Sequence, residues 1–281
     1  MIRIITDSTC EASPEVLRHP AVTVIPLTVV FGHEALRDGV DITREQFWAR
    51  LPSSSPLPST SQAVPSDFDG LFEQFTAAGD EVIAVLLSGK LSGTVSSALI
   101  AYESKPGWPV EIVDSKSTSV GLGLMVQEAV AMVDRGATRE EIVRRLEEMR
   151  EHVHIVFVLE TLEYLQRGGR IGKAQAFVGT LLQFKPLLGI VDGEVVPLTR
   201  VRSRAKALEA AQDALLRRVA ARGNAVAVAV THALAGDEAD EFARRLTASF
   251  GTQSCFTADL GPVLGVHVGP GTIGAAVVDR R

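Results

Sequence analysis

The sequence predicts an α/β protein of two domains. The chain has 281 residues, which favours two domains at about 150 residues each. Apolar strands alternate with helical patterns up to about residue 160, as in right-handed βαβ units that form a parallel sheet. The remainder has a hairpin signal and a strand-rich end. We therefore place a parallel-sheet α/β/α domain at residues 1–160. A second α/β domain, with a mixed or antiparallel sheet plus helices, is placed at residues 161–281.

Apolar runs predict the strands of the N-terminal half, and capping residues predict its helices. Strands are expected at residues 2–6, 22–31, 81–87, 110–114 and 155–159, the last of which closes this half. Helix starts are marked by Ser13 before Pro14, Thr43 with Gln46, Thr138 with Glu141, and small residues near Ser119. Aromatic and leucine residues at helical spacing predict an amphipathic helix over residues 67–78. The Pro- and Ser-rich residues 52–66 are predicted to be a long irregular loop.

The second half has a different pattern. Residues 162–184 are predicted to be helices interrupted at Gly168-Gly169, and Ser203 is predicted to cap a long helix to about residue 221. Two apolar runs flank Asp192-Gly193, a dipeptide that is typical of tight hairpins. A strand is expected at residues 225–231, a helix at 237–250, and strands with Gly-Pro turns over 254–278.

Composition and charge exclude several classes of protein. Lys and Arg number 28 against 34 Asp and Glu, a net charge of −6, whereas nucleic-acid binders need clustered basic side chains. Cys10 and Cys255 form no metal or redox motif and are expected to be reduced thiols. The N-terminus lacks a signal-peptide core, and no segment approaches the ~20 apolar residues of a membrane span. We expect a cytoplasmic protein without cofactor, metal, nucleic-acid partner or membrane span.

The segment from Ser88 to Thr94 connects a predicted strand to a predicted helix. Glycines let the backbone approach a ligand, and a helix N-terminus presents free N–H groups and a positive dipole end. Ser92 and Thr94 add hydroxyls. This combination suits a carboxylate or a phosphate. It is equally typical of an ordinary capping serine with turn glycines, so both interpretations stay open.

Two further segments could contribute to the same site. The hydroxyls of Ser59, Thr60 and Ser61 could reach the same anion, although a solvated Ser-rich linker is the simpler interpretation. His267 lies in a Gly- and Pro-rich segment, where it either packs in a turn or donates a hydrogen bond into a cleft. The basic residues 200–206 are typical of a solvated helix start and could also dock an acidic partner.

Several well-known motifs are missing from the sequence. There is no GxxxxGK[ST] phosphate-binding loop, no GxGxxG after the first strand and no HExxH pair. The segment GKLSG has its serine in fourth place and so does not match the GxSxG nucleophile elbow. A serine hydrolase that uses Ser92, His267 and an acid such as Asp114 remains an alternative, because such triads occur in any chain order. A binding module for a small anion such as a sugar phosphate is a second alternative.

Seven segments follow one another in a characteristic order: TDST, PSTSQ, SGKLSGT, VDSKS, LEYLQRGGRIG, RVRSRAKA and GVHVGPG. Together they resemble the DegV family, the fatty-acid-binding proteins that serve bacterial fatty acid kinase. The resemblance covers nearly the whole chain. It implies a two-domain α/β protein that is not itself an enzyme and that holds a long-chain fatty acid, such as palmitate, between and within its domains.

The resemblance also implies roles for individual residues. The fatty-acid carboxylate is expected at Thr60 of the TSQ segment and at Ser92, with His267 close by. Ser61, Gly93 and Thr94 are added as neighbours of this site. The partner is expected to be the catalytic subunit of fatty acid kinase, which phosphorylates the carboxylate to an acyl-phosphate for phospholipid synthesis. Arg202 is expected to dock that kinase, and contact with a membrane is expected to be transient at most.

Elementary energetics are compatible with this expectation. Burial of each CH₂ group contributes about 0.8 kcal/mol, so some fifteen of them contribute roughly 12 kcal/mol before the costs of association. A buried carboxylate needs hydrogen-bond donors. We expect hydroxyls and one imidazole to hold it without a permanent ion pair, which would leave one oxygen able to attack ATP on the partner.

Overall fold

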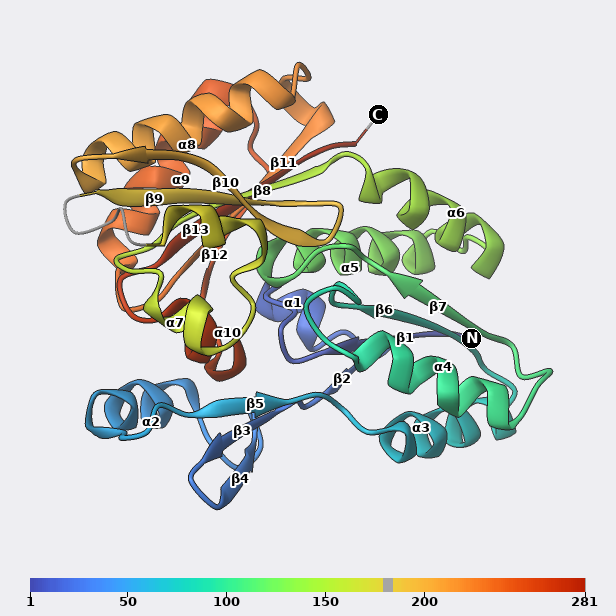
Figure 1. Ribbon diagram of the computed structural model, residues 1–281. Helices are drawn as coiled ribbons and strands as arrows, with labels where there is room; N and C mark the ends of the chain where they lie inside the picture. The colour runs from blue at the N-terminus through green and yellow to red at the C-terminus, as the bar shows by residue number, and fades with distance from the viewer. Residues whose placement is uncertain (179–183, 281) are drawn as a thin grey trace.

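The computed structural model describes residues 1–178 and 184–280, and two large sheets organise them (Figure 1). The first sheet has the order β2-β1-β6-β7, and all of its strands are parallel. Its strands are β1 (Ile2–Asp7), β2 (Val22–Ile25), β6 (Glu81–Leu86) and β7 (Val110–Asp114). Helices α3 (Pro65–Ala77) and α4 (Thr94–Ser104) pack on one face. On the other face lie α1 (Pro14–Leu17), α5 (Ser119–Asp134) and α6 (Arg139–Arg150).

The second sheet is mixed and has the order β10-β9-β8-β13-β11-β12. Its strands are β8 (Val153–Val158), β9 (Lys185–Val191), β10 (Glu194–Val201), β11 (Val226–His232), β12 (Cys255–Asp259) and β13 (Ile273–Asp279). Only β11 and β12 pair in parallel among these described strands. Helices α8 (Arg204–Arg218) and α9 (Gly236–Phe250) cover its outer face. The short helix η3 (Gly223–Ala225) lies between α8 and β11 in the chain. The predicted α/β class, with a parallel sheet followed by a mixed one, is confirmed.

Helix α5 lies between the two large sheets and packs against both of them (Figure 1). Its buried residues belong to an apolar cluster that extends from β1 and β6 to the inner face of the second sheet. A second apolar cluster fills the space between the outer face of that sheet and helices α8 and α9. The cavity described below lies within the inner cluster.

A third, small sheet has the order β4-β3-β5, with antiparallel pairing throughout. It consists of β3 (Thr28–Phe31), β4 (Glu34–Arg37) and β5 (Ser59–Ser61), and it is accompanied by α2 (Arg44–Arg50) and η1 (Leu51–Ser53). Helix α10 (Pro262–Val268) comes from the other end of the chain and packs on this sheet and on α2. The predicted site segments around Thr60 and His267 thus meet here.

Several local predictions are confirmed. Thr43, Thr138 and Ser203 accept the expected capping hydrogen bonds. Asp192 and Gly193 have φ values of 48° and 76°, as a two-residue turn with both φ angles positive requires, and β9 and β10 pair as an antiparallel hairpin. Ser13 precedes a helix with Pro14 at its start, but its side chain forms no capping hydrogen bond.

Four predictions need correction. The extended run over residues 22–31 is two strands in different sheets, β2 and β3, separated at Pro26. Residues 52–66 are not one irregular loop, since they contain most of η1, all of β5 and the start of α3. Strand β8 does not close the N-terminal half, because it pairs with β9 and β13 in the second sheet. The strand-rich end contains a helix, α10, which carries His267.

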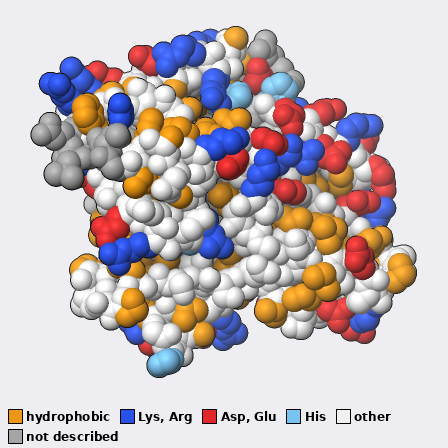
Figure 2. All heavy atoms as spheres, in the orientation of Figure 1, with side chains coloured by type: hydrophobic (Ala, Val, Ile, Leu, Met, Phe, Trp, Pro, Cys, Tyr) orange, Lys and Arg blue, Asp and Glu red, His pale blue; other side chains and the backbone are white. Residues whose placement is uncertain are grey.

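The helices predicted over residues 162–184 are α7 (Glu163–Arg167) and η2 (Gly172–Phe177), separated near Gly168-Gly169 as expected. Residues 179–183 of that prediction lie outside the described residues. Within residues 1–178 and 184–280, no helix is both long and apolar enough to cross a membrane. Figure 2 shows acidic and basic side chains interspersed over the face that it presents, so both signs of charge share this face.

Candidate functional site

A cavity opens between the inner face of the second sheet, the N-terminal end of α5 and helix α10. It encloses about 910 Å³ of space that no atom fills, part of it open to solvent. Its walls are mostly apolar and include Leu27, Leu91, Ile155, Phe157, Leu165, Ile190, Val195, Leu260, Val263, Leu264 and Val268.

Polar side chains from several separate segments also line the cavity. Thr60, Ser61 and Gln62 come from β5 and the residue after it, and Ser92 comes from the turn before α4. His267 comes from α10, and Arg170 from the segment after α7. The structure therefore brings together four of the predicted residues, Thr60, Ser61, Ser92 and His267, although they lie far apart in the sequence.

Thr60 and His267 form a direct hydrogen bond in this cavity. Thr60 lies opposite Val29 in the β3/β5 pair, and its Oγ1 is 2.9 Å from His267 Nε2. Nδ1 of His267 is buried and has no hydrogen-bond partner among the residues that the structure describes. A Cβ at Gly168 would lie 2.2 Å from this Nδ1, so glycine is required for the close approach.

The protonation of His267 determines what Thr60 can donate. Burial, and then the charge of Arg170, lower the pKa of His267 to about 4, so the ring is neutral at pH 7. An unpaired buried N–H group is rarer in proteins than an unpaired acceptor, which favours the tautomer with its hydrogen on Nε2. In that tautomer His267 donates to Thr60, and the Thr60 hydroxyl keeps its own hydrogen for a ligand.

Ser92 is held by the turn that the sequence analysis singled out. The backbone N–H groups of Leu91 and Ser92 both donate to the carbonyl of Ser88. Ser92 Oγ accepts from Thr94 N at 3.3 Å and lies 2.9 Å from Thr94 Oγ1. Thr94 is fully buried and does not line the cavity itself, so it orients Ser92 rather than facing a ligand.

Strand β5 with Thr60 and the turn with Ser92 are packed against each other through Gln62. Gln62 Nε2 donates to Ser97 Oγ at 3.1 Å. A Cβ at Gly93 would lie 2.2 Å from Gln62 Oε1, so Gly93 leaves room for this contact. Gly93 is therefore a packing neighbour of the site and does not line the cavity.

Arg170 is a cavity residue that the sequence analysis did not single out. Its Nε donates to the Leu91 carbonyl at 3.1 Å, and its Nη1 donates to the Gly168 carbonyl at 2.8 Å. The guanidinium is thus fixed next to both the turn of Ser92 and the ring of His267. Arg170 adds a cation to a polar lining that was expected to consist of hydroxyls and one imidazole. The signal was present in the segment LEYLQRGGRIG, in which Arg170 follows the two glycines.

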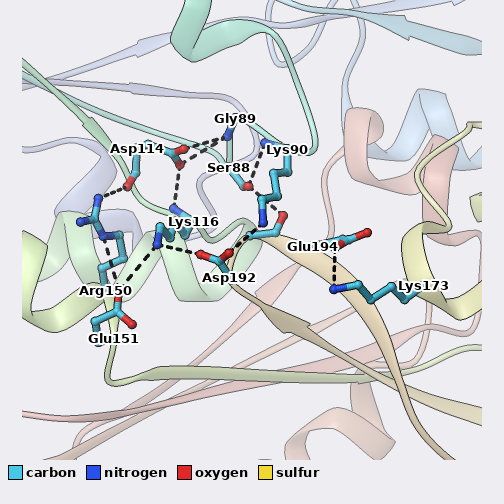
Figure 3. A network of polar contacts seen from close by, with 11 residues as sticks. Ser88, Gly89, Lys90, Asp114, Lys116, Arg150, Glu151, Lys173, Asp192 and Glu194 are labelled. Atoms are coloured by element: carbon cyan, nitrogen blue, oxygen red, sulfur yellow. Dashed lines mark hydrogen bonds and ion pairs between the residues drawn. The ribbon is translucent and has the colours of Figure 1, made fainter.

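The tip of the β9–β10 hairpin closes on the same turn (Figure 3). Ser88 Oγ donates to the Gly193 carbonyl at 2.8 Å. A Cβ at Gly193 would lie 2.3 Å from Ser88 Oγ, so glycine leaves room for this contact. Lys90 and Lys116 contact the Asp192 carboxylate at 2.8 and 2.7 Å, and these hydrogen bonds lower its pKa to about 2. The second sheet therefore supports the turn that carries Ser92.

The remaining predicted residues lie elsewhere. Arg202 is exposed in the link between β10 and α8. Asp114, the acid of the hydrolase alternative, accepts hydrogen bonds from the backbone N–H groups of Gly89 and Lys116. His267 contacts Thr60, and no described carboxylate orients its Nδ1. The described residues therefore do not form a Ser-His-Asp triad. They also contain no group of His, Cys, Asp or Glu suited to a metal ion.

Acid should destabilise the lipid-free protein more than it destabilises a His267→Gln variant. The folded ring has a pKa of about 4, whereas histidine in an unfolded chain titrates near 6.5. The unfolded state therefore binds more protons between these values, and stability is lost as pH falls from about 6.5 to about 4. The wild-type protein is expected to lose up to about 3 kcal/mol of unfolding free energy that the variant keeps. Urea denaturation at several pH values measures this difference.

Two buried carboxyl groups titrate in the same pH range and contribute equally to the stability curves of the wild type and the variant. Burial raises the pKa of Glu11 to about 7 and that of Asp38 to about 6. Their folded forms hold protons that the unfolded chain releases, so their contribution to stability decreases as pH rises. Both groups are present in wild type and variant, and the difference between the two curves isolates His267. Parallel curves would show that His267 is not held as a neutral buried ring.

Comparisons with known proteins find one family along nearly the whole chain. A family model described as an uncharacterised protein of the DegV family matches residues 1–280. A DegV domain-containing protein of Halalkalibacterium halodurans is 36% identical over 274 residues, which cover 97% of this chain and 96% of that protein. A solved DegV family protein of Thermus thermophilus, described as fatty-acid binding, has a TM-score of 0.93 at 33% identity and covers 99% of both chains. A solved stearic-acid-binding protein of Eubacterium ventriosum has a TM-score of 0.90 at 29% identity, covering 100% of this chain and 99% of its own.

Proposed function

The chain belongs to the DegV family, and from that membership we propose that it binds a long-chain fatty acid such as palmitate. Solved members of the family are described as fatty-acid-binding proteins. In this proposal the carboxylate lies at Thr60, Ser92 and His267, and the acyl chain occupies the apolar part of the cavity. The protein itself catalyses no reaction and needs no cofactor.

One observation supports this proposal more than any other: hydroxyls, an imidazole and a guanidinium line a cavity whose other walls are largely apolar. A fatty acid has the matching division into a charged end and a long apolar end. Burial of its methylene groups supplies affinity at about 0.8 kcal/mol each. The buried carboxylate needs donors, which Thr60 and Ser92 offer without displacing any protein contact of His267.

Arg170 changes the electrostatics that we expect for the bound carboxylate. Its Nε and Nη1 already donate to the carbonyls of Leu91 and Gly168, so it acts on the ligand mainly through its charge. A nearby cation keeps a buried carboxylate ionised. Thr60 and Ser92 then orient the ionised group, and an oxygen that faces the cavity mouth stays able to react.

We further propose that the bound fatty acid is presented to a separate kinase in the cytoplasm. A carboxylate oxygen attacks the γ-phosphorus of ATP on that partner, the bond between this phosphorus and the β,γ-bridging oxygen breaks, and ADP leaves. The product is an acyl-phosphate, which would supply phospholipid synthesis. The kinase step is carried over from the family resemblance, and the absence of a GxxxxGK[ST] segment fits a protein that leaves ATP binding to its partner.

The role proposed for Arg202 is separable from lipid binding. Arg202 is exposed and lies outside the set of cavity-lining residues, so Arg202→Ala should leave palmitate affinity unchanged. The same variant should slow acyl-phosphate formation with the kinase, because a charged docking contact is lost. Binding is measured by calorimetry and product formation by hydroxamate trapping. Arg218→Ala, at the far end of α8, is the matched control and should affect neither. Equal loss of binding and turnover in Arg202→Ala would contradict a docking role.

The direct test of the proposed function is the chemical identity of the bound molecule. Organic extraction of the purified protein followed by mass spectrometry should yield a long-chain fatty acid. A small-anion binder would yield none and would be stabilised by sugar phosphates instead. A serine hydrolase would release p-nitrophenol from a p-nitrophenyl ester in a burst, and Ser92→Ala would abolish this burst. Either of these outcomes, without bound lipid, would overturn the proposal.

A further inference from the structure

Glu11 is a buried carboxylate that none of the site chemistry described above uses. Its side chain is 1% exposed and lies behind the cavity wall, just after β1. Isolated buried charges are costly, so a glutamate in this position must be compensated by donors. Burial raises its pKa to about 7, against the opposing effect of hydrogen bonds from Ser119 and Thr231.

Three donors from three separate elements converge on the Glu11 carboxylate. Oε2 accepts from the hydroxyl of Ser119, the first residue of α5, and from Thr231 of β11 at 2.7 Å. Oε1 accepts from the backbone N–H of Gly261 at 2.8 Å, and Gly261 caps the N-terminus of α10. Ser119 and Thr231 also line the cavity, with their hydroxyl hydrogens directed to Glu11.

Helix α10 links this carboxylate to the head-group end of the cavity. The helix runs only from Pro262 to Val268, so His267 is about two turns, roughly 10 Å, from Gly261. Its middle is tightly packed, because a Cβ at Gly265 would lie 2.5 Å from the ring of Phe47. A shift of its N-terminus is therefore transmitted to His267 and cannot be absorbed within so short and constrained a helix.

Asp38 reinforces the same anchoring. Its Oδ2 accepts from the backbone N–H of Val263 at 3.4 Å, one turn or less from the Gly261 contact. Trp48 Nε1 donates to the carbonyl of Leu260 at 3.4 Å. Residues from the N-terminal part of the chain thus hold the N-terminal end of α10. The C-terminal end of the helix presents the ring of His267, which is hydrogen-bonded to Thr60.

We propose that Glu11 is a positioning residue for the fatty-acid head group: by holding Gly261 it fixes helix α10, and by fixing α10 it holds His267 against Thr60. This inference rests on the proposed function for its ligand, but its geometric part concerns the lipid-free protein as well. Glu11 touches neither the carboxylate nor the acyl chain in this arrangement. It acts only through the elements that it joins.

Glu11→Met tests the proposal, because methionine fills a similar volume and cannot accept these hydrogen bonds. In the lipid-free protein, NMR titration of the His267 ring should move upward from about 4 toward the ordinary value near 6.5, as water reaches a displaced ring. Palmitate affinity should fall about ten-fold or more. Glu11→Gln keeps an oxygen for Gly261, and the hydroxyls of Ser119 and Thr231 can rotate to accept, so both values should stay close to wild type.

Asp80 provides a matched control for simple loss of stability. It is also a buried carboxylate, 7% exposed, and it pairs with the N-terminal amine and Arg3 at the opposite end of the first sheet. Asp80→Leu should destabilise the fold without moving the His267 titration or the palmitate affinity. If Glu11→Met behaves like Asp80→Leu, Glu11 is merely structural and the proposal is wrong.

A measurement on the wild-type protein keeps the proposal testable should Glu11→Met fail to fold. The Gly261 amide proton should shift together with the Glu11 carboxyl carbon in a pH titration, since the two groups are hydrogen-bonded. A Gly261 amide that stays constant while Glu11 titrates would overturn the contact. Wild-type protein that binds no palmitate, combined with a shifted His267 titration in Glu11→Met, would overturn the proposed function alone.

Discussion

Removing both head-group hydroxyls, by Thr60→Val together with Ser92→Ala, should weaken palmitate binding by about two orders of magnitude or more. A hydrogen bond to a charged group contributes about 1.5–3 kcal/mol, and each factor of ten in affinity corresponds to about 1.4 kcal/mol. The two hydroxyls contact one carboxylate, so their effects will not be strictly additive. Valine keeps the shape of threonine at position 60, which confines the change to hydrogen bonding.

Calorimetric titration with palmitate measures this loss, and the single variants apportion it. Thr60→Val should have the larger single effect, because it also leaves Nε2 of His267 without its partner at 2.9 Å. The matched control replaces Thr76 by Val and Ser104 by Ala, since these hydroxyls bond only to carbonyls of their own helices, α3 and α4. A double site variant that binds palmitate as tightly as the control would show that the carboxylate lies elsewhere.

Local sequence patterns predicted those parts of the fold that local physics determines. Thr43 and Thr138 satisfy the N–H groups of the residues three positions later, so these helix starts need no distant partner. Asp192 and Gly193 adopt positive φ angles within a two-residue turn, which fixes the register of β9 against β10. The alternation of strands and helices likewise predicted the parallel first sheet.

The elements that were predicted wrongly depend on distant partners. Strand β5 is only three residues long and exists because β3 pairs with it, which no pattern within residues 52–66 indicates. Strand β8 has the same apolar composition as its predecessors, and only its pairing with β9 and β13 assigns it to the second sheet. Sheet membership is a tertiary property in both cases.

Helix α10 was missed although its signals were present. Gly261 and Pro262 are the cap and first residue of a helix, yet the glycines and prolines that follow are more typical of turns. Gly265 is tolerated within the helix because Phe47 and Trp48 occupy the space of its missing Cβ. The energetic cost of glycine in a helix is thus offset by packing that the sequence alone does not reveal.

The site was predicted in part. Thr60, Ser92 and His267 line one cavity, an arrangement that the ordered motifs suggested and that single motifs could not. Arg170 and Glu11 were missed because what sets them apart is their contacts with distant segments. Isolated charged residues are usually solvated, and only the structure shows Arg170 fixed by two carbonyls and Glu11 surrounded by three donors.

A larger side chain on the apolar wall should narrow the cavity and reduce the length of the longest fatty acid that binds tightly. Ile190 of β9 lies opposite Ile155 of β8, and both line the cavity. Ile190→Trp places a larger ring in that space, where it would displace the distal part of a palmitoyl chain. Exclusion of about four methylene groups corresponds to about 3 kcal/mol, or roughly a hundred-fold loss of affinity. Shorter acids, which do not reach the ring, should bind nearly as before.

The same substitution separates a fatty-acid site from a small-anion site. The ring fills empty space, so the lipid-free Ile190→Trp protein should melt no lower than wild type. Val191→Trp is the matched control, because successive side chains of a strand point to opposite faces and Val191 is 40% exposed. Affinities for acids from octanoate to palmitate, measured by calorimetry, should fall with chain length only in Ile190→Trp. A uniform affinity across that series would mean that the acyl chain does not lie along this wall, and that the polar end of the cavity binds its anion without an apolar tail.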